Sequence, residues 1–199
     1  MAKPRVFTAQ EWGARPPTVA KFPRQGAVGI VVHNTESANR AMLDGEEEKK
    51  AIFRLARAIQ ANHMSRKPPY SDTGQHFTVS RGGLILEGRH GSLAAARDGQ
   101  VVTGAHAGSA VHNKSWFGIE VEGDFRGAYS VTEPQWRALV ELCAWLSFWG
   151  GFDSTNILGH KQVKTAAGGT DCPGHLMDRL DDLRDAVHSR KLEIISETG

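Results

Sequence analysis

The chain has 199 residues, of which 40% are hydrophobic and 23% are charged, and its formal net charge is +2. This is the composition of a globular protein large enough to bury its own core, and two cysteines are too few for a disulfide scaffold. The balanced charge excludes a dedicated nucleic-acid-binding protein, and no apolar run approaches the ~20 residues of a membrane-spanning helix, so neither nucleic acid nor membrane insertion is expected.

Residues 1–27 are rich in Pro, Arg and Gly, and this composition predicts an extended arm that lies over a domain. The first residues are basic but no apolar segment follows them, so we expect no secretory signal and synthesis in the cytoplasm. Cysteines stay reduced in that compartment. Each cysteine is therefore interpreted as a core residue or a metal ligand before a disulfide partner.

An apolar run at residues 28–32 predicts a buried strand that ends at His33. Residues 45–63 predict a helix, because their apolar side chains share one face and glutamates begin the segment, where the helix dipole favours acids. Two strand-like runs, at 76–80 and 84–87, are separated by a glycine pair and predict a hairpin.

Residues 88–115 are rich in Gly, Ala and His and are expected to be irregular. A loop of this length inside a compact domain usually carries function. Residues 117–121 predict another strand. The clearest helix spans 132–149, where Thr132 and Gln135 have the spacing of a capping box and a glycine pair ends the pattern.

Residues 156–159 predict a short strand that leads to His160, and residues 174–188 predict a last helix with leucine and valine side chains turned inward. Residues 189–199 are polar and are expected to form a tail or the start of a linker. Strands and helices thus alternate, with one hairpin among them. This order predicts a single α/β domain with a central mixed β-sheet flanked by helices.

Three residues have the chemistry of metal ligands. His33 and His160 each follow a predicted strand, and Cys172 lies in a Gly/Thr-rich loop. Strand ends and the loops after them are where α/β folds build their sites. Two imidazoles and a thiolate suit tetrahedral zinc with a fourth position open to water. The spacing alone also fits two hydrogen-bonded histidines and a buried cysteine, and it does not choose between these interpretations.

Glu120 interrupts an apolar strand in the sequence F-G-I-E-V-E-G. If Ile119 and Val121 face one way, Glu120 faces the other, together with Glu122, so alternation does not choose between the two acids. A carboxylate in an apolar strand is costly unless it has a partner or a chemical role. The alternative is that this face of the strand is solvated.

Seven short motifs occur along roughly residues 10–188, and together they carry a resemblance. They are W-G-A-R at 12–15, V-V-H-N-T at 31–35, G-Q-H-F at 74–77, H-A-G at 106–108, N-K-S-W-F-G-I-E at 113–120, G-H-K at 159–161 and T-D-C-P-G at 170–174. In this order the chain resembles the zinc-dependent N-acetylmuramoyl-L-alanine amidases, whose fold is shared with peptidoglycan recognition proteins and many phage lysins. The resemblance implies that residues 28–188 are the amidase catalytic domain.

The resemblance also implies roles for single residues. His33, His160 and Cys172 match the ligands of one zinc ion per chain. Glu120 matches the catalytic glutamate of bacterial members. Thr170 matches a Lys or Thr position that faces the reacting carbonyl.

Other positions of the motifs are candidate contacts with the substrate, namely Gln75, His106 and Asn34. Many members have a tyrosine where this chain has Gln75, and the tyrosine hydroxyl helps at the metal. The glutamine therefore favours a mechanism that depends on Glu120 over one that is assisted by a tyrosine hydroxyl.

The implied activity is hydrolysis of the amide between N-acetylmuramic acid and L-alanine in peptidoglycan, with peptidoglycan as partner and the protein as a monomer. The expected setting is a phage lysin that acts on the bacterial cell wall after holin-mediated release. The alternatives are a non-catalytic peptidoglycan-binding protein, a cytoplasmic recycling amidase and a zinc peptidase that cuts within the stem peptide. Binding-only members typically lose the cysteine ligand, so Cys172 favours the enzyme.

Overall fold

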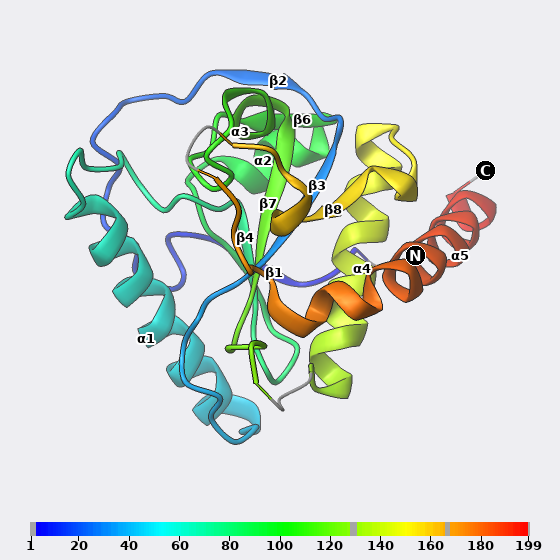
Figure 1. Ribbon diagram of the computed structural model, residues 1–199, viewed down its shortest axis with the longest axis horizontal. Helices are drawn as coiled ribbons and strands as arrows, with labels where there is room; N and C mark the ends of the chain where they lie inside the picture. The colour runs from blue at the N-terminus through cyan, green and yellow to red at the C-terminus, as the bar shows by residue number, and fades with distance from the viewer. Residues whose placement is uncertain (1–2, 128–130, 166–167, 199) are drawn as a thin grey trace.

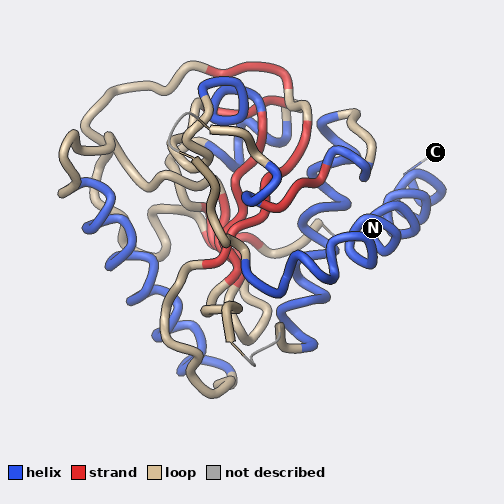
Figure 2. The backbone as a smooth tube through the Cα atoms, viewed as in Figure 1, coloured by secondary structure: helices blue, strands red, loops and turns tan. Residues whose placement is uncertain are grey.

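The computed structural model describes residues 3–127, 131–165 and 168–198. Its centre is a six-stranded sheet in the order β1-β5-β4-β7-β3-β8, and helices cover both faces (Figure 1, Figure 2). The predicted single α/β domain with a central mixed sheet is confirmed. Residues 1–2 of the expected arm and Gly199 of the expected tail lie outside the described residues.

The sheet is mixed because only its β4–β5 pair is antiparallel among the described pairings, as expected for a hairpin. The strands are β1 Val6–Phe7, β3 Gly29–Asn34, β4 Phe77–Val79, β5 Ile85–Glu87, β7 Trp116–Val121 and β8 Ile157–Gly159. The two longest, β3 and β7, pair in parallel at the middle of the sheet. Their carboxyl ends therefore meet at one edge of the sheet.

The helices lie in two layers, with α1 (Gly45–Met64) on one face of the sheet and α4 (Glu133–Gly150) with α5 (Leu180–Thr198) on the other (Figure 1). The larger core lies on the α4 side and contains alternate residues of the central strands, among them Val32 and Ile119. The intervening residues of the same strands face the α1 side. None of the helices in the described part of the chain is both long enough and apolar enough to cross a bilayer.

The N-terminal arm is part of the fold rather than an extended cover. Its β1 adds a parallel strand to β5, and β2 (Arg24–Gly26) pairs with β6 (Gln100–Val102) in a second, two-stranded sheet. Trp12 is buried, and its indole Nε1 donates a hydrogen bond to the Glu87 carbonyl at 2.6 Å. Ladder pairing and burial of this large side chain thus hold the arm in place.

Two further segments differ from expectation because their elements are short or polar. The segment 88–115 contains α2 (Ser92–Arg97), β6 and α3 (Ala110–Ser115), each too short to show a hydrophobic period. The last helix begins as a 3₁₀ segment, η3 (Gly174–Arg179), and α5 then continues through the expected tail to Thr198. Ile194 is buried in the core and Arg190 pairs with Glu141 of α4 at 2.6 Å, so the tail residues have a packing partner.

Helix α4 shows half of the predicted capping box. The Thr132 hydroxyl accepts a hydrogen bond from the Gln135 backbone N–H at 3.3 Å. The Gln135 side chain does not return to the cap. Its amide donates to the carbonyls of Val79 and Glu122, and it thereby ties the start of the helix to the sheet. Gly151 ends the helix with φ of 68°, a conformation that glycine adopts without strain.

Candidate functional site

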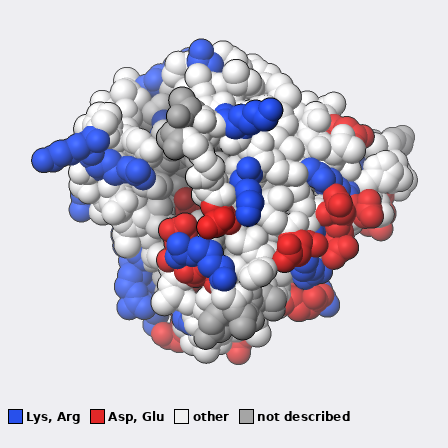
Figure 3. Space-filling view, viewed as in Figure 1, with Lys and Arg blue, Asp and Glu red and all other residues white. Residues whose placement is uncertain are grey.

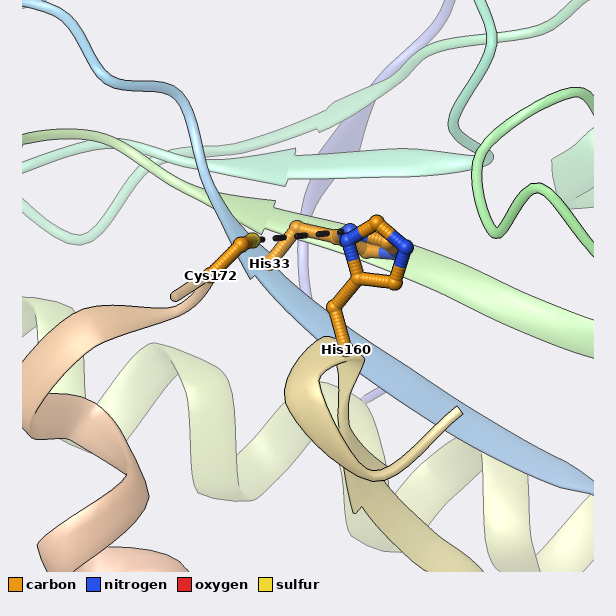
Figure 4. A group of neighbouring side chains, drawn as sticks. All are labelled: His33, His160 and Cys172. Carbon is orange, nitrogen blue, oxygen red and sulfur yellow. Dashed lines mark hydrogen bonds between the residues drawn. The ribbon is translucent and has the colours of Figure 1, made fainter. Parts of the chain in front are cut away.

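The three predicted metal ligands meet at the carboxyl edge of the sheet. His33 lies near the end of β3, and His160 opens the short 3₁₀ helix η2 (His160–Gln162) directly after β8. Because β8 runs parallel to β3, with Gly159 beside Val32, the two imidazoles come together. Cys172 reaches them from the loop before η3 (Figure 4). The three ligand atoms all lie within 4.8 Å of one another.

This donor set fits zinc. The His33 Nδ1 and Cys172 Sγ atoms are 3.8 Å apart, and a tetrahedral zinc site would place such atoms about 3.6 Å apart. Burial lowers the pKa of His33 and of His160, so both rings are neutral, the form that binds metals. Burial raises the pKa of the Cys172 thiol to about 12, and a divalent cation is the kind of charge that makes such a thiol lose its proton.

A pocket of about 510 Å³ opens over the three ligands, and its lining includes every site residue that the sequence predicts. These residues are His33, Asn34, Gln75, His106, Glu120, His160, Thr170 and Cys172. On the face of the molecule shown in Figure 3, Lys and Arg are mixed with Asp and Glu rather than gathered into a field of one sign.

Glu120 and Glu122, which alternation could not separate, have different surroundings. Glu120 lines the pocket, and its Oε2 atom has no hydrogen-bond partner among the described residues. Burial, with a smaller contribution from Glu36, raises the pKa of Glu120 to about 8. Glu122 is instead buried in an ion pair with Arg40 at 2.7 Å and accepts from the Arg81 backbone N–H. Glu120 is therefore the acid that is available to a bound molecule.

The Thr170 hydroxyl lies next to the predicted metal ligands, and its proton has no acceptor among the described residues. Its Oγ1 accepts a hydrogen bond from the Cys172 backbone N–H at 3.1 Å, which leaves the O–H hydrogen available for a molecule in the pocket. The Asn34 backbone N–H in turn donates to the Cys172 sulfur at 3.5 Å. These two contacts hold the cysteine from both sides.

Two buried amides add polar atoms to the pocket wall. Gln75 donates from Nε2 to the Thr78 hydroxyl at 3.2 Å, and its Oε1 has no partner among the described residues. The Asn34 side chain likewise has neither of its polar atoms paired within the described ranges. Buried polar groups are normally hydrogen-bonded, so these atoms are suited to contact a bound ligand.

His106 lines the pocket and also touches a metal ligand. Its Nδ1 lies 3.0 Å from Nε2 of His33, and its Nε2 lies 3.2 Å from the Trp116 carbonyl oxygen. The sequence indicated only a contact with substrate at this position. The contact with His33 could not be predicted, because it depends on how the loop after β6 returns to β7.

Several pocket residues were not singled out as site residues by the sequence. His63, at the end of α1, accepts a hydrogen bond on Nδ1 from the Gly74 N–H at 3.0 Å. The Arg66 guanidinium lies 5.1 Å from the centre of the Tyr70 ring. These three side chains form one wall of the pocket. These residues precede the G-Q-H-F motif in the sequence, and Gly74 of that motif lines the same pocket. Their position before the motif is the only feature of the sequence that could have pointed to them.

Comparison with known proteins identifies the family of this chain. Residues 24–175 match the family described as N-acetylmuramoyl-L-alanine amidase. Peptidoglycan-recognition protein LB of Drosophila melanogaster is 26% identical over 200 residues, covering 100% of this chain and 77% of that protein. The structure of wild-type Drosophila PGRP-LB is similar with a TM-score of 0.69 and 25% identity, over 90% of this chain and 94% of that chain.

The same fold occurs in a bacterial enzyme. The N-acetylmuramoyl-L-alanine amidase LysC from Clostridium intestinale URNW has a TM-score of 0.65 and 22% identity, over 92% of this chain and 97% of that chain. The family match spans most of the sequence and includes the two histidines and the cysteine of the site. The chain therefore belongs to the N-acetylmuramoyl-L-alanine amidase family.

Proposed function

We propose that this protein is a zinc-dependent hydrolase that cleaves the amide between N-acetylmuramic acid and L-alanine in peptidoglycan. The observation that carries the proposal is a group of three residues that could hold a metal ion, His33, His160 and Cys172, in one pocket with a carboxylate that no described residue pairs. A protein that only bound peptidoglycan would need neither the buried thiol nor the unpaired acid.

The residues around the ligands supply the acid–base chemistry of amide hydrolysis. When bound, zinc acts as a Lewis acid that polarises the amide carbonyl and eases deprotonation of water. Glu120 takes the proton from the attacking water and delivers it to the leaving amine of L-alanine. Burial raises the pKa of Glu120 above that of an exposed glutamate, so its carboxylate is a stronger base than usual, as proton transfer from water requires.

Other pocket residues stabilise and orient the substrate. The free hydroxyl hydrogen of Thr170 donates to the oxyanion that forms as the carbonyl is attacked. The buried amides of Asn34 and Gln75 hydrogen-bond to polar groups of the substrate, and they thereby regain the partners that they lack. The wall of His63, Arg66 and Tyr70 extends the pocket along the substrate.

The test is mass spectrometry of the products released from purified sacculi by the zinc-loaded protein, with a chelator-treated sample beside it. We expect stem peptides with a free L-alanine amino group, and none after chelation. Peptides cut within the stem would identify a peptidase instead. Binding to sacculi without any product would identify a recognition protein. Running the assay on soluble muropeptides in parallel separates a wall-degrading enzyme from a recycling amidase.

A further inference from the structure

We propose that His106 is a positioning residue that selects the tautomer of His33, so that His33 presents the lone pair of Nδ1 to the metal. The proposal rests on the metal centre of the proposed function, but not on the identity of the bond that is cleaved. Neither ring nitrogen of His106 is a metal ligand in this assignment, since His106 lies outside the group of His33, His160 and Cys172.

A backbone carbonyl fixes the position of the proton on the His106 ring. The Trp116 oxygen can only accept a hydrogen bond, so the His106 Nε2 atom, 3.2 Å away, carries the ring proton. A neutral imidazole has one N–H, and the Nδ1 atom of His106 is therefore an acceptor. That atom lies 3.0 Å from Nε2 of His33, which must donate. His33 then carries its proton on Nε2 and none on Nδ1.

The bare nitrogen faces the other ligands. His33 Nδ1 lies 3.8 Å from the Cys172 sulfur and belongs to the same group of ligand atoms as the ring of His160. The His33 and His160 ring centres are 4.4 Å apart, and Figure 4 shows the Cys172 side chain pointing toward these rings. The chain of hydrogen bonds from Trp116 thus ends in a lone pair directed at the metal position.

The ring of His106 packs closely against the backbone at two glycines. A Cβ atom added at Gly118 would lie 2.5 Å from Cγ of His106, and one at Gly104 would lie 2.9 Å from its Cδ2. Two glycines therefore let the ring pack directly against backbone. The Asn113 side chain fixes the loop itself, because its Oδ1 accepts from the backbone N–H groups of His106 and Ala107, each at 2.9 Å.

The imidazole of His76 packs beside the His106 ring. His76 is fully buried, and its ring lies 5.3 Å from that of His106. His76 accepts from the Gly118 N–H on Nδ1 at 2.8 Å and reaches the Val102 carbonyl with Nε2 at 2.7 Å, so its own tautomer is set by backbone. The orientation of His106 is therefore determined before any metal binds.

Such a partner matters for metal affinity. Outer groups that orient a metal-binding histidine typically change affinity by about 10- to 100-fold. We therefore expect His106→Phe, which keeps a ring but removes the acceptor, to weaken zinc binding by about 10- to 100-fold. His106→Asn places a carbonyl oxygen near the position of Nδ1 and should recover most of the lost affinity.

Zinc affinity is measured by competition with a chromophoric chelator, and His188→Phe serves as the matched control because it removes an exposed histidine of α5. The control should bind zinc as the parent protein does. Wild-type affinity in His106→Phe would overturn the proposal. So would equal losses in the Phe and Asn variants, since packing of the ring rather than its acceptor would then be responsible.

A second measurement needs no variant. Long-range proton–nitrogen NMR spectra of the metal-free protein report which nitrogen of each histidine ring is protonated. We expect His33 with a proton on Nε2 and a bare Nδ1, and the opposite assignment would overturn the proposal. Neither measurement uses turnover, so a failure of the proposed peptidoglycan cleavage would leave both results readable.

Discussion

His33 of β3 and Glu120 of β7 are register partners in a parallel strand pair. The first proposed metal ligand and the proposed proton carrier therefore leave neighbouring strands at the same level of the sheet, about 4.8 Å apart. Both strands are central, so this spacing is held by hydrogen bonds on each side rather than by a loop. The sheet itself thus sets the spacing between the proposed metal ligand His33 and the carboxylate of Glu120.

The first prediction concerns this carboxylate. Glu120→Gln removes the proton carrier but no metal ligand. Turnover should fall by at least ~100-fold, the usual size of a general acid–base contribution, while zinc content and melting temperature stay close to the parent values. The measurement is turnover on muropeptides together with metal analysis of the same sample.

Glu122→Gln is the matched control for charge and strand. Glu122 pairs with Arg40, which also binds Glu48, so the variant should melt at a lower temperature. Its turnover per folded molecule should remain near that of the parent. An inactive but fully folded Glu122 variant, beside an active Glu120 variant, would contradict the assignment.

The second prediction compares the two cysteines. Cys172→Ser should lose most of its zinc on mild dialysis, because a hydroxyl is a much weaker ligand for zinc than a thiolate. Cys143 is also buried, but it lies on α4 and packs in the hydrophobic core of the domain. The Cys143→Ala variant should therefore keep its zinc. Metal analysis after dialysis decides the matter. Full zinc retention by the Cys172 variant would remove it from the ligand set.

The third prediction concerns stability. The ligands come from residues 33, 160 and 172, so bound zinc links segments that are far apart in sequence. A ligand present at 1,000 times its Kd stabilises the folded state by about 4 kcal/mol. For a chain of this length we expect chelation to lower Tm by roughly 10 °C. Scanning calorimetry with and without chelator checks this, and the Cys172→Ser variant should show little difference.

The fourth prediction is a pH dependence at the Asp72–His90 pair. Burial acts to raise the pKa of Asp72, but hydrogen bonds from His90, Gln60 and Thr73 outweigh it and lower the pKa. The hydrogen bond to Asp72 raises the pKa of His90. The Asp72 contribution to stability is thus lost as pH falls below about 4, and that of His90 is lost as pH rises above about 6.5.

Asp72→Asn should therefore reduce the free energy of unfolding most between about pH 4 and 6.5, and less at pH 8. Urea denaturation at several pH values measures this difference. His90→Gln should abolish the decline on the alkaline side and keep the decline on the acidic side. A loss of stability that does not vary with pH would show that the pair acts through packing alone.

His33 and His160 were placed at strand ends and Cys172 in a loop, and parallel strands bring their carboxyl ends together. These positions alone left metal ligands and hydrogen-bonded core residues equally open, and the ligand set and Glu120 were implied by the resemblance to the amidase family. Alternation could not separate Glu120 from Glu122, and the choice of Glu120 came from the motif that it shares with the family. In the structure, Glu120 lines the pocket whereas Glu122 is paired with Arg40. That arginine lies in a loop with no periodic pattern. The proposed effect of His106 on the His33 tautomer could not be predicted from the sequence either, because it depends on the position of the Trp116 carbonyl.

The errors in the fold have a common cause. Strand β1 contains two residues, and it forms by pairing with β5, which lies almost eighty residues further along the chain. Nothing local predicts such a contact. The end of α5 is polar except for a few side chains, and its helical structure depends on burial of Ile194 against the core. Tertiary packing therefore determines the secondary structure of both β1 and the end of α5.

The strands at the two edges of the sheet, β1 and β8, are short. Exposed edge strands offer unpaired backbone groups to other chains, and long edges promote aggregation. Here β1 offers two residues and β8 three. On β8, the Ile157 carbonyl already accepts from the Arg184 guanidinium at 2.7 Å, and the strand ends where His160 turns into the site. The short strand that leads to the proposed metal ligand His160 thus also limits edge-to-edge aggregation of the folded protein.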